Sequence, residues 1–164
     1  MDINFNAPVR IIKEILPQMM ENDNGHIVNI ASVLGYIGCC GISDYCASKS
    51  ALVGFEESVR FELFKANSNV KMTSICPYLI NTQLFEGVQP KKWFEILVPK
   101  LDQKYVAQRI LYAIRQNERV VILPYIMYII LAIKPLLPSW LHEIIQDLSG
   151  SNEVMDHLKI KKKQ

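Results

Sequence analysis

The segment "HIVNIASVLGYIGCCGISDYCASKSALVGF", residues 26–55, decides the fold of this chain. Its first part, residues 26–32, is short, β-branched and apolar, which is typical of a strand buried on both faces of a sheet. A glycine-rich loop follows, and a helical pattern then runs over residues 43–64. The loop glycines match neither a dinucleotide fingerprint nor a phosphate loop, so we expect a flexible loop over a substrate pocket.

The rest of the chain alternates between helical and strand patterns. Apolar residues recur at helical spacing in residues 7–20 and 101–117, while residues 70–77 and 119–124 have the composition of strands. Residues 78–99 show no regular pattern. Strands that alternate with helices in this order predict an α/β fold, in which three parallel strands are joined by right-handed crossovers.

The composition argues against several classes of protein. Half of the residues are hydrophobic and the formal net charge is +2, which indicates a globular domain with a real core. We expect no nucleic-acid partner, because no basic patch is interleaved with aromatic residues. The cysteines and histidines lack the spacing of a metal site or of a secreted disulfide scaffold. No basic and apolar leader follows Met1, so we expect a chain that is not secreted and faces the cytosol.

Three polar side chains are expected to meet at one end of the sheet. Tyr45 and Lys49 stand four residues apart near the start of a predicted helix, so their side chains share one face. Ser32 stands at the carboxyl end of the predicted strand, where open α/β sheets bind their ligands. Two simpler interpretations stay open. Ser32 ends the strand without a chemical role, or Asn4 caps the helix that follows it.

This set of residues resembles the short-chain dehydrogenase/reductase family. "VNIAS" is similar to the family's active-site strand, "YCASK" to its Tyr-x-x-x-Lys element, and Asn4 to its helix asparagine. "PYLINT", residues 77–82, resembles the segment that closes over the nicotinamide, although Tyr78 replaces the usual glycine. "CPYLINTQLFEGV" and "ILVPKLDQKYVAQRIL" are most similar to family 16C, a subgroup with epidermal retinol dehydrogenases and some 17β-hydroxysteroid dehydrogenases.

The resemblance implies an NAD- or NADP-dependent oxidoreductase for lipophilic alcohols or carbonyls, such as retinoids and steroids. Tyr45 would exchange a proton with the substrate oxygen, Ser32 would hydrogen-bond that oxygen, and Lys49 would also hold the nicotinamide ribose. Asn4 would order a water that passes protons to solvent. The implied cofactor contacts are Tyr45, Lys49, Pro77, Ile80 and Thr82.

Simple electrostatics supports the pairing of Tyr45 with Lys49. Lowering the pKa of a phenol by roughly 2 to 3 units needs about 3 to 4 kcal/mol of preferential stabilisation of the phenolate. One ammonium at about 4 to 5 Å supplies about that much at an effective dielectric constant near 20. The sequence therefore predicts that Lys49 lowers the pKa of Tyr45.

The family's glycine turn, Thr-Gly-x-x-x-Gly-x-Gly, is not in this sequence. The resemblance therefore implies the carboxyl-terminal half of a Rossmann-type doubly wound parallel sheet, whose first strands are missing. Residues 1–124 would form the catalytic half and residues 125–164 an apolar helical extension with a basic tail. The strand at residues 26–32, central in the family, would then have an unpaired apolar edge.

The extension also suggests contact with a lipid surface. The uncharged run 120–133 is too short for a spanning helix, so we expect residues 125–140 to form one proline-bounded apolar helix. The alternative is a helix packed on the sheet or covering the substrate. With the basic tail "KIKKK", this helix suggests peripheral binding to endoplasmic-reticulum or lipid-droplet surfaces. A catalytically inactive fragment that pairs with a full-length relative, or a dimer through helices 7–20 and 43–64, is a further alternative.

Overall fold

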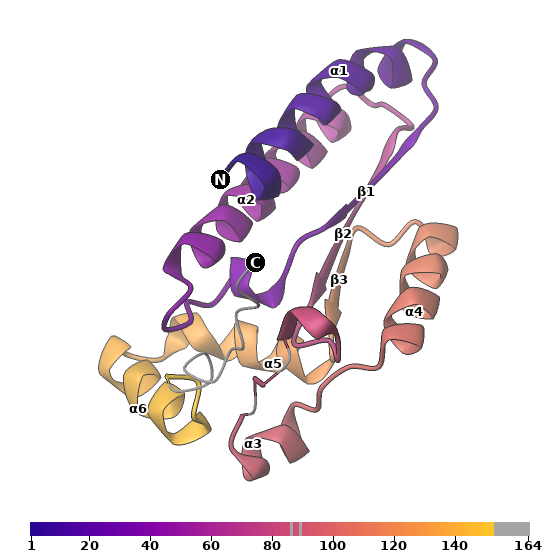
Figure 1. The fold of residues 1–164 in the computed structure, drawn as a ribbon. Coiled ribbons are helices and arrows are strands. Elements are labelled where there is room, and N and C mark those ends of the chain that lie inside the picture. Colours follow the sequence, from indigo (N-terminus) through magenta and orange to yellow (C-terminus); the bar gives the residue numbers. More distant parts are fainter. Residues whose placement is uncertain (86, 89, 153–164) are drawn as a thin grey trace, which may run out of the picture.

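The computed structural model describes residues 1–85, 87–88 and 90–152, and Figure 1 shows its fold. Among these residues, strands β1 (His26–Ile30), β2 (Lys71–Pro77) and β3 (Val120–Leu123) form one parallel sheet in the order β1-β2-β3. The helices of four or more residues are η1 (Asp2–Asn6), α1 (Ala7–Glu21), α2 (Ser43–Lys65), α3 (Lys92–Leu97), α4 (Gln103–Gln116), α5 (Ile126–Ile133) and α6 (Ser139–Ser149). The predicted α/β fold with flanking helices is confirmed. The basic tail at residues 159–163 lies outside the described residues.

Helices cover the two faces of the sheet, as Figure 1 shows. On one face, α1 and α2 place Ile12, Val59 and Leu63 against Ile27 and Met72 of the strands. On the other face, α4 packs against β2 and β3; its cluster comprises Ile75, Leu101, Val106, Ala113, Val121 and Leu123. Side chains alternate across a strand, so each strand supplies both clusters.

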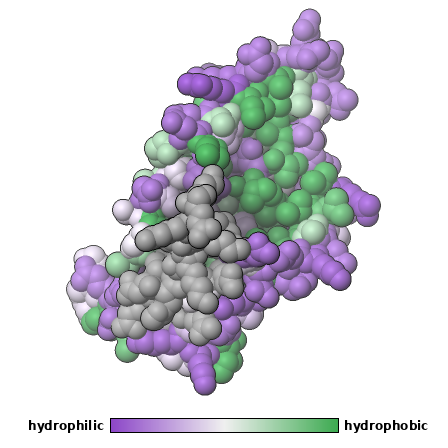
Figure 2. Space-filling view, in the orientation of Figure 1, coloured by the Kyte–Doolittle hydropathy of each residue, from purple (hydrophilic) through white to green (hydrophobic). Residues whose placement is uncertain are grey.

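β1 is more exposed than the sequence predicts. It is an edge strand, because β2 is its one strand partner among the described residues. Val28 and Ile30 point to the face that α4 covers, but α4 lies over β2 and β3, which leaves Ile30 48% exposed. Figure 2 shows hydrophobic side chains gathered between α1 and α4, over the strands. The expectation of burial on both faces is therefore wrong for β1, whereas the expected unpaired apolar edge is confirmed.

Two segments differ from the sequence prediction: one contains more helix than expected, and the other is divided into several helices. Within residues 78–99, the short 3-10 helix η3 (Gln83–Phe85) and helix α3 replace the irregular chain that we expected. The prediction of a single apolar helix at residues 125–140 is wrong. This segment is divided into α5, the 3-10 helix η4 (Lys134–Leu136) and the start of α6, because Pro135 and Pro138 interrupt the helix.

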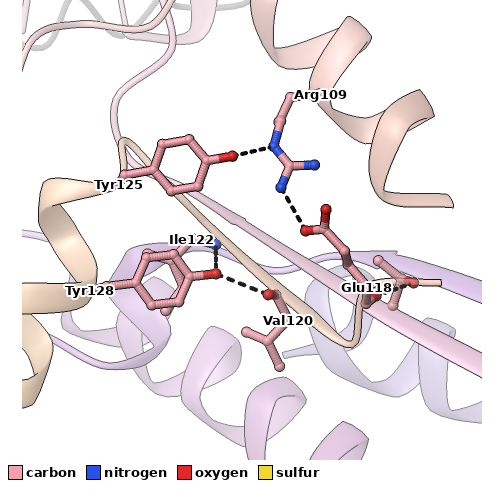
Figure 3. A network of polar contacts seen from close by, with 7 residues as sticks. Arg109, Glu118, Val120, Ile122, Tyr125 and Tyr128 are labelled. Carbon is pink, nitrogen blue, oxygen red and sulfur yellow. Dashed lines mark hydrogen bonds and ion pairs between the residues drawn. The ribbon is translucent and has the colours of Figure 1, made fainter. Parts of the chain in front are cut away.

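A side-chain network covers the free edge of β3 (Figure 3). Tyr128 Oη accepts a hydrogen bond from the backbone nitrogen of Ile122 and donates one to the carbonyl oxygen of Val120. One phenol therefore replaces the missing strand partner at two backbone groups, which protects an edge from pairing with another chain.

Within residues 1–85, 87–88 and 90–152, no helix is long and apolar enough to cross a bilayer.

The carboxyl ends of the strands point to the same end of the molecule (Figure 1). The 3-10 helix η2 (Val33–Gly35) follows β1 there, and α3, α5 and α6 lie at this end as well. Met127 of α5 belongs to the buried cluster that also contains Val33, Leu52 and Ile122. This cluster therefore joins the loop after β1 to α2, β3 and α5.

Candidate active site

Tyr45 and Lys49 lie on the first turns of α2, as the sequence predicts. The Lys49 ammonium lies 5.8 Å from the centroid of the Tyr45 ring, and both side chains are half-buried. Its Nζ atom donates a hydrogen bond of 2.9 Å to the carbonyl oxygen of Ile30, the last residue of β1. The lysine is therefore held between its own helix and the end of the edge strand.

Ser32 follows β1 in extended conformation and caps η2, where its Oγ atom accepts a hydrogen bond from Leu34 N at 3.1 Å. Its Oγ atom donates a hydrogen bond of 3.5 Å to the carbonyl oxygen of Pro77, and Ser32 lies close enough to Tyr45 to affect the pKa of the phenol. The loop after Ser32 approaches α2 closely. A Cβ atom at Gly35 would lie 2.9 Å from the Lys49 carbonyl oxygen, so this position requires glycine. Ser32 thus ends a strand and also meets Tyr45.

The pKa of Tyr45 is raised above its ordinary value, contrary to the expectation from its pairing with Lys49. Burial of the phenol is the largest cause, and the hydrogen bond from Ser32 opposes it. The Lys49 ammonium lies over the ring and donates its hydrogen bond to Ile30 O, and it does not reverse the effect of burial. Burial also lowers the pKa of Lys49, which the nearby Glu56 partly opposes. In this chain Tyr45 is therefore a protonated phenol at neutral pH, suited to donating a proton.

Asn4 joins the same cluster from η1. Its Nδ2 atom donates a hydrogen bond of 3.2 Å to Ser48 Oγ, and Ser48 Oγ donates one of 2.7 Å to the Tyr45 carbonyl oxygen. The capping interpretation of Asn4 is not supported, since Asn6 occupies the cap position of α1 and makes no side-chain cap hydrogen bond. Asn4 is instead fixed against the turn of α2 that carries Tyr45 and Lys49.

The expected cofactor contacts Pro77, Ile80 and Thr82 lie at and beyond the end of β2. Pro77 is next to Ser32, and Ile80 forms an isolated bridge with Leu101. Thr82 Oγ1 is buried without a hydrogen-bond partner among the described residues. A buried hydroxyl without a partner costs free energy, so this atom fits a site that receives a polar group of a ligand. The residues present here therefore fit the nicotinamide end of NAD or NADP.

An apolar cavity of about 180 Å³ adjoins Ser32. Its wall comes from the loop after β1, from Tyr78 and Leu79, and from α5, η4 and α6. Tyr78, which replaces the family's usual glycine, has its backbone nitrogen bonded to the Leu123 carbonyl oxygen at 2.7 Å, and burial raises the pKa of its phenol to about 12. Apolar lining around a few polar groups is typical of small-molecule sites.

Sequence reasoning missed a buried carboxyl group on α2. Glu56 is 0% exposed, its Oε2 atom accepts a hydrogen bond from Ser74 Oγ, and Ser74 Oγ accepts one from Arg60 Nη1 at 2.9 Å. Burial raises the pKa of Glu56, and the hydrogen bond from Ser74 opposes that effect. The spacing of Glu56 from Lys49 could have indicated this carboxyl group from the sequence. Glu56 stands seven residues after Lys49, a spacing that returns to the same face of a helix.

Sequence reasoning also missed the residues that α6 adds to the cavity wall. His142, Ile145, Gln146 and Ser149 line it, although they follow the segment that we expected to form a helix. No local pattern in the sequence marks these residues as partners of the loop after β1.

Comparisons with known proteins agree with this geometry. The family model described as short chain dehydrogenase matches residues 1–93. The chain is 41% identical over 150 residues to epidermal retinol dehydrogenase 2 of Mus musculus, covering 91% of this chain and 48% of that protein. It is 40% identical over 139 residues to retinol dehydrogenase 10-B of Xenopus laevis, covering 84% and 41%. The chain therefore spans about half the length of the curated relatives it matches.

Solved structures agree on the fold. A short-chain dehydrogenase from Burkholderia cenocepacia in complex with NADP is 21% identical and has a TM-score of 0.63, covering 96% of this chain and 58% of that one. One from Sphingobium yanoikuyae in complex with NADPH is 20% identical with the same TM-score, covering 99% and 57%. With the family model over most of the chain and relatives at about 40% identity, this chain belongs to the short-chain dehydrogenase family and resembles its retinol dehydrogenases.

Proposed function

We propose that this chain carries the proton-transfer and substrate-binding part of an NAD(P)-dependent oxidoreductase that acts on lipophilic alcohols or carbonyl compounds. The observation that carries the proposal is the cluster of Ser32, Tyr45 and Lys49, of which Ser32 lines an apolar cavity.

The residues of the cluster would divide the chemistry as follows. The nicotinamide cofactor, when bound, accepts or donates the hydride at the substrate carbon. Tyr45 Oη gives a proton to the substrate oxygen in reduction and takes it back in oxidation. Ser32 Oγ, which acts on the Tyr45 phenol from the end of β1, holds that oxygen in place. Lys49 orients the nicotinamide ribose, while Asn4 and Ser48 fix the turn of α2 from which Tyr45 extends.

Cofactor binding would combine Lys49 with the segment after β2. The unpartnered Thr82 hydroxyl is the polar atom that we assign to the nicotinamide end, next to Pro77 and Ile80. Nothing in this set selects between NAD and NADP, because adenosine-binding residues make that choice in Rossmann folds. The pyrophosphate-binding glycine turn is not in this sequence, so we propose that the chain is inactive alone and works only with a cofactor-binding half.

The substrate would be retinoid-like or steroid-like. The cavity supports this, since its lining is mainly apolar and its polar groups are few. The relatives at about 40% identity are retinol dehydrogenases by name, which favours a retinoid over a steroid. This substrate class remains our proposal for the present chain.

A chimera tests the proposal. The amino-terminal half of mouse epidermal retinol dehydrogenase 2 is fused before Met1, and retinol oxidation and retinal reduction are followed with NAD and NADP. We expect turnover that Tyr45→Phe removes and that the exposed-site control Tyr105→Phe retains. A folded chimera that binds cofactor but turns over neither substrate, or that works equally well without the Tyr45 hydroxyl, contradicts the proposal.

A lipid-surface role is the second candidate. Exposed apolar side chains run along α5, η4 and α6, and they include Ile129, Ile133, Leu136 and Trp140. Leu136 is 79% and Trp140 60% exposed, and aromatic side chains of this kind favour a membrane interface. We propose peripheral contact with the cytosolic side of endoplasmic-reticulum or lipid-droplet membranes, so that a lipophilic substrate enters beside this segment.

Pairing through α1 and α2 is the remaining alternative for the partner of this chain. Ile11 and Ile15 of α1 and Phe61 and Phe64 of α2 are exposed, so both helices offer apolar side chains to a partner. We propose a homodimer, or a heterodimer with a full-length relative, through these two helices. Light scattering gives the molar mass of the chain alone, which tests the homodimer, and of its mixture with mouse epidermal retinol dehydrogenase 2, which tests the heterodimer.

A further inference from the structure

The cavity beside Ser32 has a second group of polar side chains, which the proposed chemistry does not use. They are Lys134 of η4 and His142 and Gln146 of α6. Lys134 Nζ donates a hydrogen bond of 2.5 Å to the Tyr36 carbonyl oxygen, and Gln146 Nε2 donates one of 3.1 Å to the Gly38 carbonyl oxygen. His142 Nε2 donates one of 2.6 Å to the Lys134 carbonyl oxygen. Lys134 and Gln146 are therefore fixed against the loop after β1, whereas His142 is bonded to η4.

The Lys134 ammonium group can donate further hydrogen bonds to a ligand. An ammonium group has three donor hydrogens, and one hydrogen bond is made by Lys134 Nζ among the described residues. The same part of the chain contains one ion pair, Arg109 with Glu118, so no described carboxylate neutralises Lys134. A half-buried ammonium in the wall of an apolar cavity attracts a counter-charge more strongly than one in bulk water does. An anionic group of a ligand would supply that charge.

Ser32 and the second group of polar side chains line different walls of the cavity. Ser32 stands at the carboxyl end of β1, whereas Lys134 belongs to the segment after α5, and apolar side chains such as Val33, Met127 and Ile130 also line the cavity. A ligand with one polar end leaves the Lys134 ammonium without a counter-charge. A ligand with a polar group at each end satisfies both walls.

We propose that this site, among lipophilic alcohols and carbonyl compounds, prefers those with a second, acidic group, the carboxylate of which pairs with Lys134. The proposal rests on the proposed function for the reacting end, at Ser32 and Tyr45. The corresponding chemical class is an ω-hydroxy or ω-oxo carboxylic acid with an apolar chain. The cavity of about 180 Å³ slightly exceeds one of about 150 Å³ that holds benzene, so short apolar chains are the first probes.

Calorimetric titration of the full chain tests this proposal without any cofactor. The probes are 10-hydroxydecanoic acid, its methyl ester and 1-decanol, which share the chain and the reacting hydroxyl. We expect the acid to bind at least about tenfold more tightly than the ester, since charge-assisted hydrogen bonds are the strong ones. Lys134→Gln keeps a donor for the Tyr36 carbonyl oxygen but removes the charge, and should abolish that difference.

Lys92→Gln is the matched control, because Lys92 is exposed on α3 and does not line the cavity. It should keep the tenfold preference, and circular dichroism should show all variants folded. Equal affinities for acid and ester, or a preference that survives Lys134→Gln, overturn the acidic-substrate proposal and leave the proposed oxidoreductase function standing. If none of the three probes binds, the use of this cavity for lipophilic substrates fails as well.

Discussion

Lys49 Nζ donates a hydrogen bond of 2.9 Å to the carbonyl oxygen of Ile30, so the lysine of the Tyr-x-x-x-Lys element is tied to the edge strand of the sheet. Ile30 is half-exposed because nothing described covers that side of β1. The bond uses one of three ammonium donors, which leaves two for a ribose. The geometry of Lys49 therefore depends on how the edge strand is held.

The chain alone should bind neither NAD(H) nor NADP(H) at micromolar concentration. The glycine turn that lets a helix N-terminus meet the pyrophosphate is not in this sequence, and the contacts at Lys49 and Thr82 cover one end of the cofactor. Calorimetric titration measures this. A micromolar dissociation constant would show that the described residues bind cofactor without that turn.

In the active chimera, the three site residues should differ in their kinetic effects. Tyr45→Phe should lower kcat by about 100-fold or more, since acid-base groups contribute about that much. Ser32→Ala should mainly lower kcat, whereas Lys49→Ala should weaken cofactor binding and lower kcat together. Steady-state kinetics with a cofactor titration separates these effects. Residual activity above about a tenth in Tyr45→Phe contradicts the acid-base assignment.

Glu56 should make the stability of the chain depend on pH. Burial raises the pKa of its carboxyl above the ordinary 4.5, so the folded chain holds this proton at pH values where the unfolded chain has lost it. Its contribution is therefore complete below pH 4.5 and is lost as the pH rises through the folded pKa, by at most about 1.4 kcal/mol per pH unit.

The matched variants are Glu56→Gln and Glu57→Gln, the second at an exposed neighbour. Urea unfolding between pH 4 and 8 should show that Glu56→Gln gains stability relative to the wild type as the pH rises, whereas Glu57→Gln changes little. Parallel pH profiles for the wild type and Glu56→Gln would show that the buried carboxyl does not retain its proton on folding.

The Arg109 network should stabilise the junction of α4, β3 and α5 (Figure 3). Arg109 Nη2 pairs with Glu118 Oε2 at 2.6 Å and Nε donates to Tyr125 Oη at 2.7 Å, while the arginine side chain is 13% exposed. Arg109→Met should lower the free energy of unfolding by about 1 to 3 kcal/mol and Tyr125→Phe by about 1 kcal/mol. The exposed control Arg115→Met should cost under about 0.5 kcal/mol. Urea unfolding of the three variants and the wild type measures these differences in the free energy of unfolding.

Membrane contact should depend on the apolar side chains after α5. Leu136→Glu and Trp140→Glu should reduce flotation with vesicles of phosphatidylcholine and phosphatidylserine, because a charge at these exposed positions opposes insertion into the interface. The control Phe64→Glu changes a side chain that is 76% exposed near the end of α2. Equal loss of flotation in all three variants would indicate nonspecific adsorption.

Much of this protein followed from local sequence patterns. Apolar spacing identified the strands and the long helices, because period 2 and period 3.6 are properties of the backbone alone. Ser32, Tyr45 and Lys49 could be named for the same reason. A strand end, a loop and the first turns of a helix form one continuous unit, and the structure brings these three side chains together as expected. Asn4 also joins them through Ser48.

Only the tertiary structure decided the electrostatics of the site and the walls of the cavity. The pKa of Tyr45 is raised rather than lowered because burial outweighs the Ser32 hydrogen bond and Lys49 points to Ile30 O, and a sequence contains neither burial nor direction. Lys134 and Gln146 reach the loop after β1 across about 100 residues of sequence, through hydrogen bonds to Tyr36 and Gly38. Local propensity cannot encode such contacts, because they depend on how separate elements pack.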